Sequence, residues 1–236
     1  MAHINIKKGH DLKLLGEPDR ILSLLSAPAQ IKLHPNDFPG IKPKLLIKEG
    51  DVALKGAPIF TDKIHSEIMF TSPITGHIDE VVYGDRRRIE SINITTSSQQ
   101  DSISHSPIRL DDLSGLSHDI IRDRLYKSGL WPCIRRRPFS KIAEPNKLPK
   151  AIFIPAMSTA PFGPDFDFIL GHDSTGFQAG INVLKQLADC DIHLVVDHKS
   201  DALVFKEAEN VFFHTSSGPN PAGNVGVHIY HIDPIE

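Results

Sequence analysis

The stretch SGLWPCIRRRPFSK, from Ser128 to Lys141, combines side chains suited to an anionic or flat conjugated ligand. It holds the only tryptophan, a run of three arginines and a Pro-Phe pair. Pro138 favours an extended backbone at Arg137. Guanidinium groups form charge-assisted hydrogen bonds and stack on rings. The candidate ligand-binding residues are Trp131, Arg135, Arg137, Phe139 and Lys141. An exposed basic connector that docks on another surface would have the same composition, so both interpretations stay open.

The second candidate is the loop GPNPAGNVGVH, from Gly218 to His228. Gly218 and Gly223 have the spacing of the two glycines of a P-loop, which requires Lys and then Ser or Thr next. Asn224 and Val225 stand there instead, so we expect no nucleoside triphosphate hydrolysis. Either the loop presents backbone N–H groups to an anion or ring, or it only turns the chain. The candidate residues are Gly218, Pro221, Gly223, Gly226 and His228.

Histidine and serine patterns assign no metal and no catalytic residue. His228 and His231 would share a face of a helix, and His193 and His198 flank a predicted strand. No third ligand follows at a fixed spacing, so we expect no metal site. The sequence also contains no GxSxG elbow for a nucleophilic serine.

Composition excludes several classes of protein. The net charge of -3 argues against nucleic acid or an anionic membrane surface as a global partner. Cys133 and Cys190 form no cluster, which excludes a cysteine-ligated iron–sulfur centre and suits a reducing cytoplasm. The N-terminus lacks the apolar core of a signal peptide, and no window reaches the roughly 18–20 apolar residues of a membrane span. We therefore expect membrane association only through partner subunits.

Residues 1–105 have the pattern of a small β domain, because short strands alternate with glycine turns. The predicted strands are His3–Ile6, Lys44–Ile47, Pro58–Phe60, Glu67–Phe70, His77–Tyr83 and Arg88–Thr95, with one short helix at Asp19–Leu25. The turns at Gly50-Asp51, Lys55-Gly56 and Pro73–Gly76 resemble those of the barrel-sandwich hybrid of biotinyl and lipoyl domains. Lys63 would be the arm of such a carrier. It lacks the flanking methionines of biotin sites, so we favour a docking module without an arm.

Residues 106–236 have the pattern of an α/β domain. A polar, serine-rich stretch at residues 96–112 precedes it. The predicted elements are a helix at His118–Ser128, a strand at Ala151–Pro155, a helix at Gly176–Ala188, and strands at Ile192–Asp197 and Asn210–His214. This order predicts a Rossmann-like βαβ arrangement. The expected fold class is therefore α+β / α/β, with a barrel-sandwich hybrid at 1–105 followed by the α/β domain at 106–236.

Six segments resemble, in order, the family of A subunits of the sodium-pumping NADH:quinone reductase. They are IKKGHDL, GIKPKLLIKEGDVALKGAPIF with the following DK, FTSPITGHIDEV, SGLWPCIRRRPFSK, AIFIPAMSTAP and GPNPAGNVGVHI. The resemblance covers essentially the whole chain. It extends to the C subunit of the Rnf complex and to the NADH-binding subunit of respiratory complex I. Those relatives carry nucleotide loops and cluster cysteines that this sequence lacks.

The resemblance implies a peripheral subunit on the cytoplasmic side of the bacterial inner membrane that contributes to ubiquinone binding. Other subunits would hold the flavins, the iron and the sodium path, and this segment would have no flavin or iron–sulfur cluster of its own. The quinone motif would be Trp131–Lys141, with Cys133 and Ile134 departing from the family pattern. We expect a longer chain with an SLBB-type domain after residue 236, and an inactive isolated fragment. The alternatives are a nucleotide-binding redox protein and a purely structural docking subunit.

Overall fold

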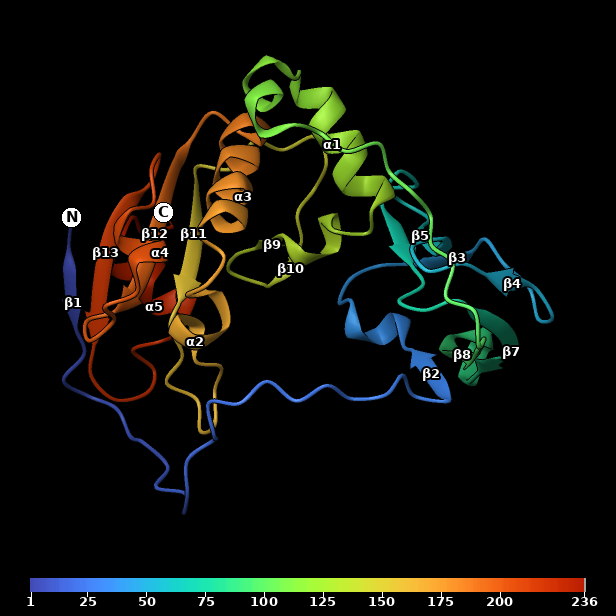
Figure 1. The fold of residues 1–236 in the computed structure, drawn as a ribbon, viewed down its shortest axis with the longest axis horizontal. Coiled ribbons are helices and arrows are strands. Elements are labelled where there is room, and N and C mark those ends of the chain that lie inside the picture. The colour runs from blue at the N-terminus through green and yellow to red at the C-terminus, as the bar shows by residue number, and fades with distance from the viewer. Residues whose placement is uncertain (236) are drawn as a thin grey trace. The chain divides into compact units, whose positions relative to one another are not determined.

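A computed structural model describes residues 1–235, which form two compact units. The β unit comprises residues 23–108 and 117–147, and the α/β unit comprises residues 1–22, 109–116 and 148–235. Figure 1 shows both, coloured along the chain.

The β unit contains two small antiparallel sheets. One has the strand order β2-β8-β7-β4 and the other the order β3-β5-β6. The bounds are β2 Gln30–Leu33, β3 Pro43–Leu45, β4 Val52–Ala53, β5 Pro58–Asp62, β6 Met69–Thr71, β7 Gly76–Tyr83 and β8 Ile89–Thr96. Residues from both sheets supply the buried core, including Ile59, Phe60, Phe70, Ile78 and Ile92. The Phe60 and Phe70 rings stack with their centroids 4.5 Å apart.

Helix α1 (His118–Lys127) and the hairpin of β9 (Arg135–Arg136) and β10 (Lys141–Ile142) also belong to the β unit. The Ser117 side chain caps α1 by accepting the N–H of Ile120. The helix ends before Gly129, which has a φ of +72°. A Cβ on Gly129 would overlap the hydroxyl of Thr71 on β6. This close approach ties the α1 segment to the small sheets.

The α/β unit has one parallel sheet with the strand order β1-β13-β12-β11. Its strands are β1 His3–Asn5, β11 Ala151–Ala156, β12 Asp191–Asp197 and β13 Phe212–Ser217. Its helices are α2 Phe166–Leu170, α3 Ser174–Leu187, α4 Leu203–Lys206 and α5 Val225–Ile232. Leu194 and Val196 form the core with Val204 and Phe205 of α4, and Phe177 of α3 packs against it. Because both faces are covered, β12 is an almost continuous apolar run.

The mixed fold class is confirmed, but the compact units do not follow the predicted division at 105/106. The predicted strand at His3–Ile6 exists as β1, yet it pairs with β13 of the α/β unit. Residues 117–147 pack instead with the β unit. Pairings between segments so far apart in sequence leave no local pattern, so the compact units contain exchanged segments that a division along the chain does not express.

Several predicted elements shift or are absent. No helix forms at Asp19–Leu25, and His193 lies within β12 rather than beside it. The last predicted strand starts two residues later and extends to Ser217. The short elements β2, β4, α2, α4 and α5 were not predicted. None of the helices formed by residues 1–235 is long and apolar enough to cross a membrane.

Candidate functional site

The arginine-rich stretch folds into a tight β-hairpin. Arg135 pairs with Ile142 and Arg136 with Lys141, so residues 137–140 form the tip. Phe139 at the tip is 77% exposed. A guanidinium nitrogen of Arg135 donates to the Ser140 carbonyl oxygen over 3.3 Å, and Arg136 forms an ion pair with Glu144. Lys147 and Arg136 lower the pKa of Glu144 by donating hydrogen bonds to its carboxylate. The predicted Arg135, Arg137, Phe139 and Lys141 therefore share one exposed hairpin.

Trp131 does not join this exposed group. Its side chain is 4% exposed, and its ring nitrogen donates to the Ala143 carbonyl oxygen at 2.8 Å. The ring meets the ring of Tyr126 edge-on, with the centroids 4.7 Å apart. Trp131 is thus a core residue that holds the base of the hairpin, and it presents no free face to a ligand.

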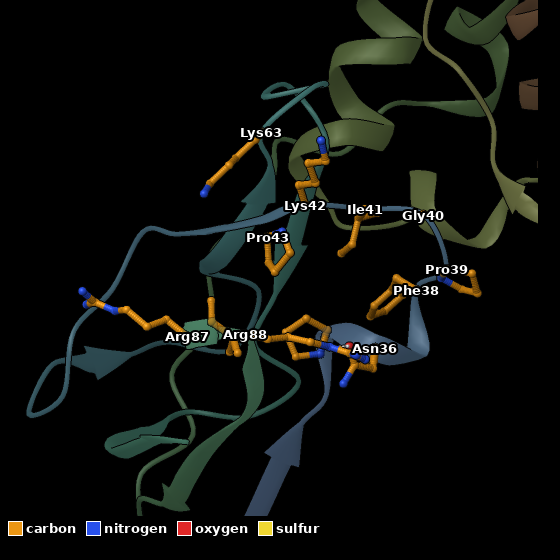
Figure 2. A pocket seen from close by; sticks show the side chains of 12 residues that line it. Asn36, Phe38, Pro39, Gly40, Ile41, Lys42, Pro43, Lys63, Arg87 and Arg88 are labelled. Carbon is orange, nitrogen blue, oxygen red and sulfur yellow. Dashed lines mark hydrogen bonds between the residues drawn. The ribbon is translucent and has the colours of Figure 1, made fainter. Parts of the chain in front are cut away.

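A pocket of about 460 Å³ lies in the β unit, formed by three separate segments (Figure 2). Its lining consists of Pro35, Asn36, Phe38, Pro39, Gly40, Ile41, Lys42, Pro43, Lys63, Arg87, Arg88 and Ile89. The ring of Phe38 packs edge-on against the ring of Phe70, 4.7 Å away. This volume falls within the range of small-molecule sites.

Lys141 connects the hairpin to this pocket. Gly40 in the pocket wall has a φ of +90°, and a Cβ placed on it would lie 3.6 Å from Cδ of Lys141. The aliphatic part of Lys141 therefore lies on the backbone of the pocket wall, as long cationic side chains commonly do. Residues 35–43 and the second arginine run, Arg86–Arg88, were not among the predicted site residues. The only local signals were that run itself and the Pro39-Gly40 turn.

The loop from Gly218 to His228 is closed by the chain itself. The N–H of Ala222 donates to the Pro219 carbonyl oxygen (2.9 Å), and that of Asn224 donates to the Pro221 carbonyl oxygen (2.8 Å). The N–H of Gly223 donates to the Thr159 hydroxyl at 3.0 Å. The Asn224 side chain caps α5 by accepting the N–H of Gly226. These backbone N–H donors are therefore occupied. The geometry favours the interpretation that the loop only turns the chain, and it disfavours the interpretation that the loop binds an anion.

The remaining two loop candidates, Gly218 and His228, also have structural roles. Gly218 has a φ of +114°, and a Cβ on it would overlap the carbonyl oxygen of Ile6 next to β1. His228 is fully buried, and its Nε2 lies 2.7 Å from the Ala222 carbonyl oxygen. Burial lowers the pKa of His228 and keeps the ring neutral. Throughout residues 1–235, no group of three or more His, Cys, Asp or Glu side chains is arranged to hold a metal ion.

The fold defines a two-unit protein of mixed α and β structure. Its β unit carries an open pocket beside a basic hairpin, and its α/β unit has a glycine loop closed by its own chain. Two family models match the sequence: the NqrA N-terminal barrel-sandwich hybrid domain at residues 4–97 and the NqrA second alpha/beta domain at residues 116–236. The chain belongs to the NqrA family, whose members are the A subunits of the Na(+)-translocating NADH-quinone reductase.

Curated relatives with the name of this family are similar in sequence to this chain over nearly its whole length. The A subunits from Yersinia pseudotuberculosis serotype O:1b (strain IP 31758) and Histophilus somni (strain 129Pt) are 35% and 34% identical. The one from Alcanivorax borkumensis (strain ATCC 700651 / DSM 11573 / NCIMB 13689 / SK2) is 32% identical. Each match covers 98% of this chain and 52% of the relative. The chain therefore spans about half the length of these relatives.

Proposed function

We propose that this chain acts as a peripheral subunit of a sodium-translocating NADH:quinone reductase on the cytoplasmic side of the membrane. In this role it contributes to the binding of ubiquinone, and the other subunits of the complex are its partners. It holds no flavin or iron–sulfur cluster of its own, consistent with its two unclustered cysteines. Support comes from the family match over both domains and from the names of the relatives.

The contact between Lys141 and Gly40 is the observation that carries the quinone assignment. It brings the basic hairpin against the wall of the β-unit pocket. A quinone needs an apolar surface for its ring and hydrogen-bond donors for its two carbonyl oxygens. Phe38 and Ile41 in the lining supply the apolar surface, and Asn36, Lys42 and Arg88 supply donors. In this proposal Lys141 joins the hairpin to the pocket wall, Phe139 and Arg137 of the same hairpin add contacts to the ligand, and Trp131 only positions the hairpin.

The test measures the affinity of a water-soluble, short-tailed ubiquinone for the purified chain by calorimetry. We expect Phe139→Ala and Lys141→Ala each to weaken binding about three- to tenfold, because each removes a contact that the proposal assigns to the hairpin. Phe162→Ala is the matched control, since Phe162 is also an exposed phenylalanine but lies in the α/β unit. Unchanged affinity in both hairpin variants would remove this segment from the quinone site.

A docking protein without a ligand is the second candidate, and one observation favours it. Leu12, Leu15 and Leu22 are 64%, 102% and 83% exposed on an N-terminal segment without regular structure. Exposed apolar side chains in such numbers are typical of a surface that a partner covers. This candidate predicts that the chain binds no quinone and that Phe139→Ala impairs assembly of the complex.

A further inference from the structure

The lining of the β-unit pocket is strongly biased in charge. Four of its residues are cationic, namely Lys42, Lys63, Arg87 and Arg88, and none is acidic. We propose that the pocket prefers the anionic charge state of a quinone-type ring, such as a quinolate, over the neutral ring. This inference rests on the proposed function and adds the charge state of the ligand that the site selects.

The four cations come from three segments that the backbone holds in place. The N–H of Lys63 donates to the Lys42 carbonyl oxygen at 2.8 Å, which links the two lysine-bearing segments. Arg87 and Arg88 belong to the β7–β8 turn, which the N–H of Gly84 closes by donating to the Arg88 carbonyl oxygen, also at 2.8 Å. Figure 2 shows the two lysines on one side of Pro43 and the two arginines on the other. The cationic residues of the lining thus lie on both sides of Pro43.

The four charges are not neutralised by ion pairs. Among the ion pairs formed within residues 1–235, none includes these side chains, whereas Glu144 pairs with both Arg136 and Lys147. Arg88 donates from Nε to the neutral side-chain oxygen of Asn36 at 3.0 Å.

Neighbouring carboxylates do not line the pocket. The buried carboxylate of Asp62 accepts the backbone N–H groups of Lys42 (2.9 Å) and Ile64 (3.3 Å). Asp37 and Asp85 lie in adjoining turns, are exposed and are absent from the lining. Lys141 adds a further cation against the wall. The field at the opening is therefore positive, although solvent and salt screen it.

The apolar part of the pocket treats both charge states alike. Phe38, Ile41, Pro43 and Ile89 contact a ring through dispersion and the exclusion of water, neither of which depends on a distant ionised oxygen. Desolvation by itself favours the neutral ring, so tighter binding of an ionised ring of similar shape reports the cationic residues of the lining. This separation makes the inference testable apart from quinone binding itself.

The experiment compares 2-hydroxy-1,4-naphthoquinone, which is ionised at neutral pH, with the neutral 2-methoxy-1,4-naphthoquinone. Calorimetry with the full 236-residue chain measures both affinities. We expect the ionised ring to bind about tenfold more tightly at low salt, and the difference to shrink as salt rises toward about 1 M. Lys63→Gln and Arg87→Gln should each weaken only the binding of the ionised ring, by about two- to fivefold.

Lys48→Gln is the matched control, because Lys48 is an exposed lysine of the β unit outside the lining, and it should change neither affinity. A second measurement follows the visible absorption of the hydroxyquinone, whose pKa should fall on binding. Equal affinity for the two rings would overturn the charge preference and leave the proposed function standing. Selective binding that persists in the Lys63→Gln/Arg87→Gln double variant would also overturn it. If neither ring binds, the proposed function fails and the charge preference fails with it.

Discussion

The imidazole rings of His193 and His214 meet on neighbouring strands, with Nδ1 of His193 lying 3.0 Å from Nε2 of His214. The N–H of Ala2 donates to Nδ1 of His214 at 3.1 Å. His214 therefore carries its proton on Nε2 and donates it to His193. Both rings are buried. Burial, with a smaller contribution from His193, lowers the pKa of His214 to about 4. Burial also lowers the pKa of His193.

We predict that the free energy of unfolding falls as the pH drops from about 6.5 to about 4. In the unfolded chain His214 takes up a proton near its ordinary pKa, whereas in the folded chain it stays neutral until about pH 4. The unfolded state thus binds more protons in this window, and His214 alone accounts for a loss of about 3 kcal/mol. Urea denaturation at successive pH values measures it. His214→Gln should flatten the profile and His105→Gln, at an exposed site, should not. Equal slopes in all three proteins would contradict the prediction.

Substitutions of Trp131 and Phe139 should differ in their effect on the free energy of unfolding, because Trp131 is buried and Phe139 is exposed. Trp131→Phe removes the hydrogen bond to Ala143 and disturbs the contact with Tyr126, so we expect a loss of about 1–3 kcal/mol. Phe139→Ala should change the free energy of unfolding by less than about 0.5 kcal/mol, because its ring is largely exposed. Chemical denaturation followed by far-ultraviolet circular dichroism measures both. A comparable loss from Phe139→Ala would show that the tip is packed, and the assignment of Phe139 to a ligand would then lose its basis.

Gly218 should tolerate no side chain. Gly218→Ala combines a positive φ with overlap between the new methyl group and the Ile6 carbonyl oxygen, so we expect a loss of about 3 kcal/mol or more. Gly16→Ala is the control, since Gly16 has a φ of +91° and open space around it, and should cost only about 1 kcal/mol. Thermal or urea unfolding compares them. Similar losses would mean that β1 moves aside to admit the methyl group.

His228 should be replaceable by an apolar residue of similar size. In His228→Leu the Ala222 carbonyl oxygen still accepts the Ser216 hydroxyl at 3.0 Å, and the unpartnered buried Nδ1 disappears. We therefore expect a loss below about 1.5 kcal/mol, against about 2–4 kcal/mol for the cavity in His228→Ala. Urea denaturation distinguishes these values. If His228→Leu folds normally but abolishes quinone or nucleotide binding, His228 has a role beyond packing.

Local chemistry explains the elements that could be predicted. Ser117 and Gly129 mark the two ends of α1 because a side-chain cap and a left-handed stop are properties of a few neighbouring residues. The helix predicted at Asp19–Leu25 failed for the converse reason. Its leucines have no surface to pack on in this structure, and a short helix is not stable without packing.

Only the hairpin residues of the candidate site could be predicted from the sequence. Arg135, Arg137, Phe139 and Lys141 were found as a basic and aromatic run, but the pocket beside them comes from residues 35–43 and the β7–β8 turn. Trp131 looked like a ligand-binding side chain because tryptophan at a surface often is one. Its burial depends on Tyr126 and Ala143, which no periodicity relates to it.

The sequence by itself determined the family, the mixed fold class, most strands and the basic, aromatic motif, because these depend on residue types close together in the chain. Only the tertiary structure decided that β1 joins β13, that Lys141 lies on Gly40 and that the glycine loop is closed by Thr159. Each of these is a contact between segments separated by dozens to hundreds of residues. Burial and shape select such contacts only once the whole unit has folded.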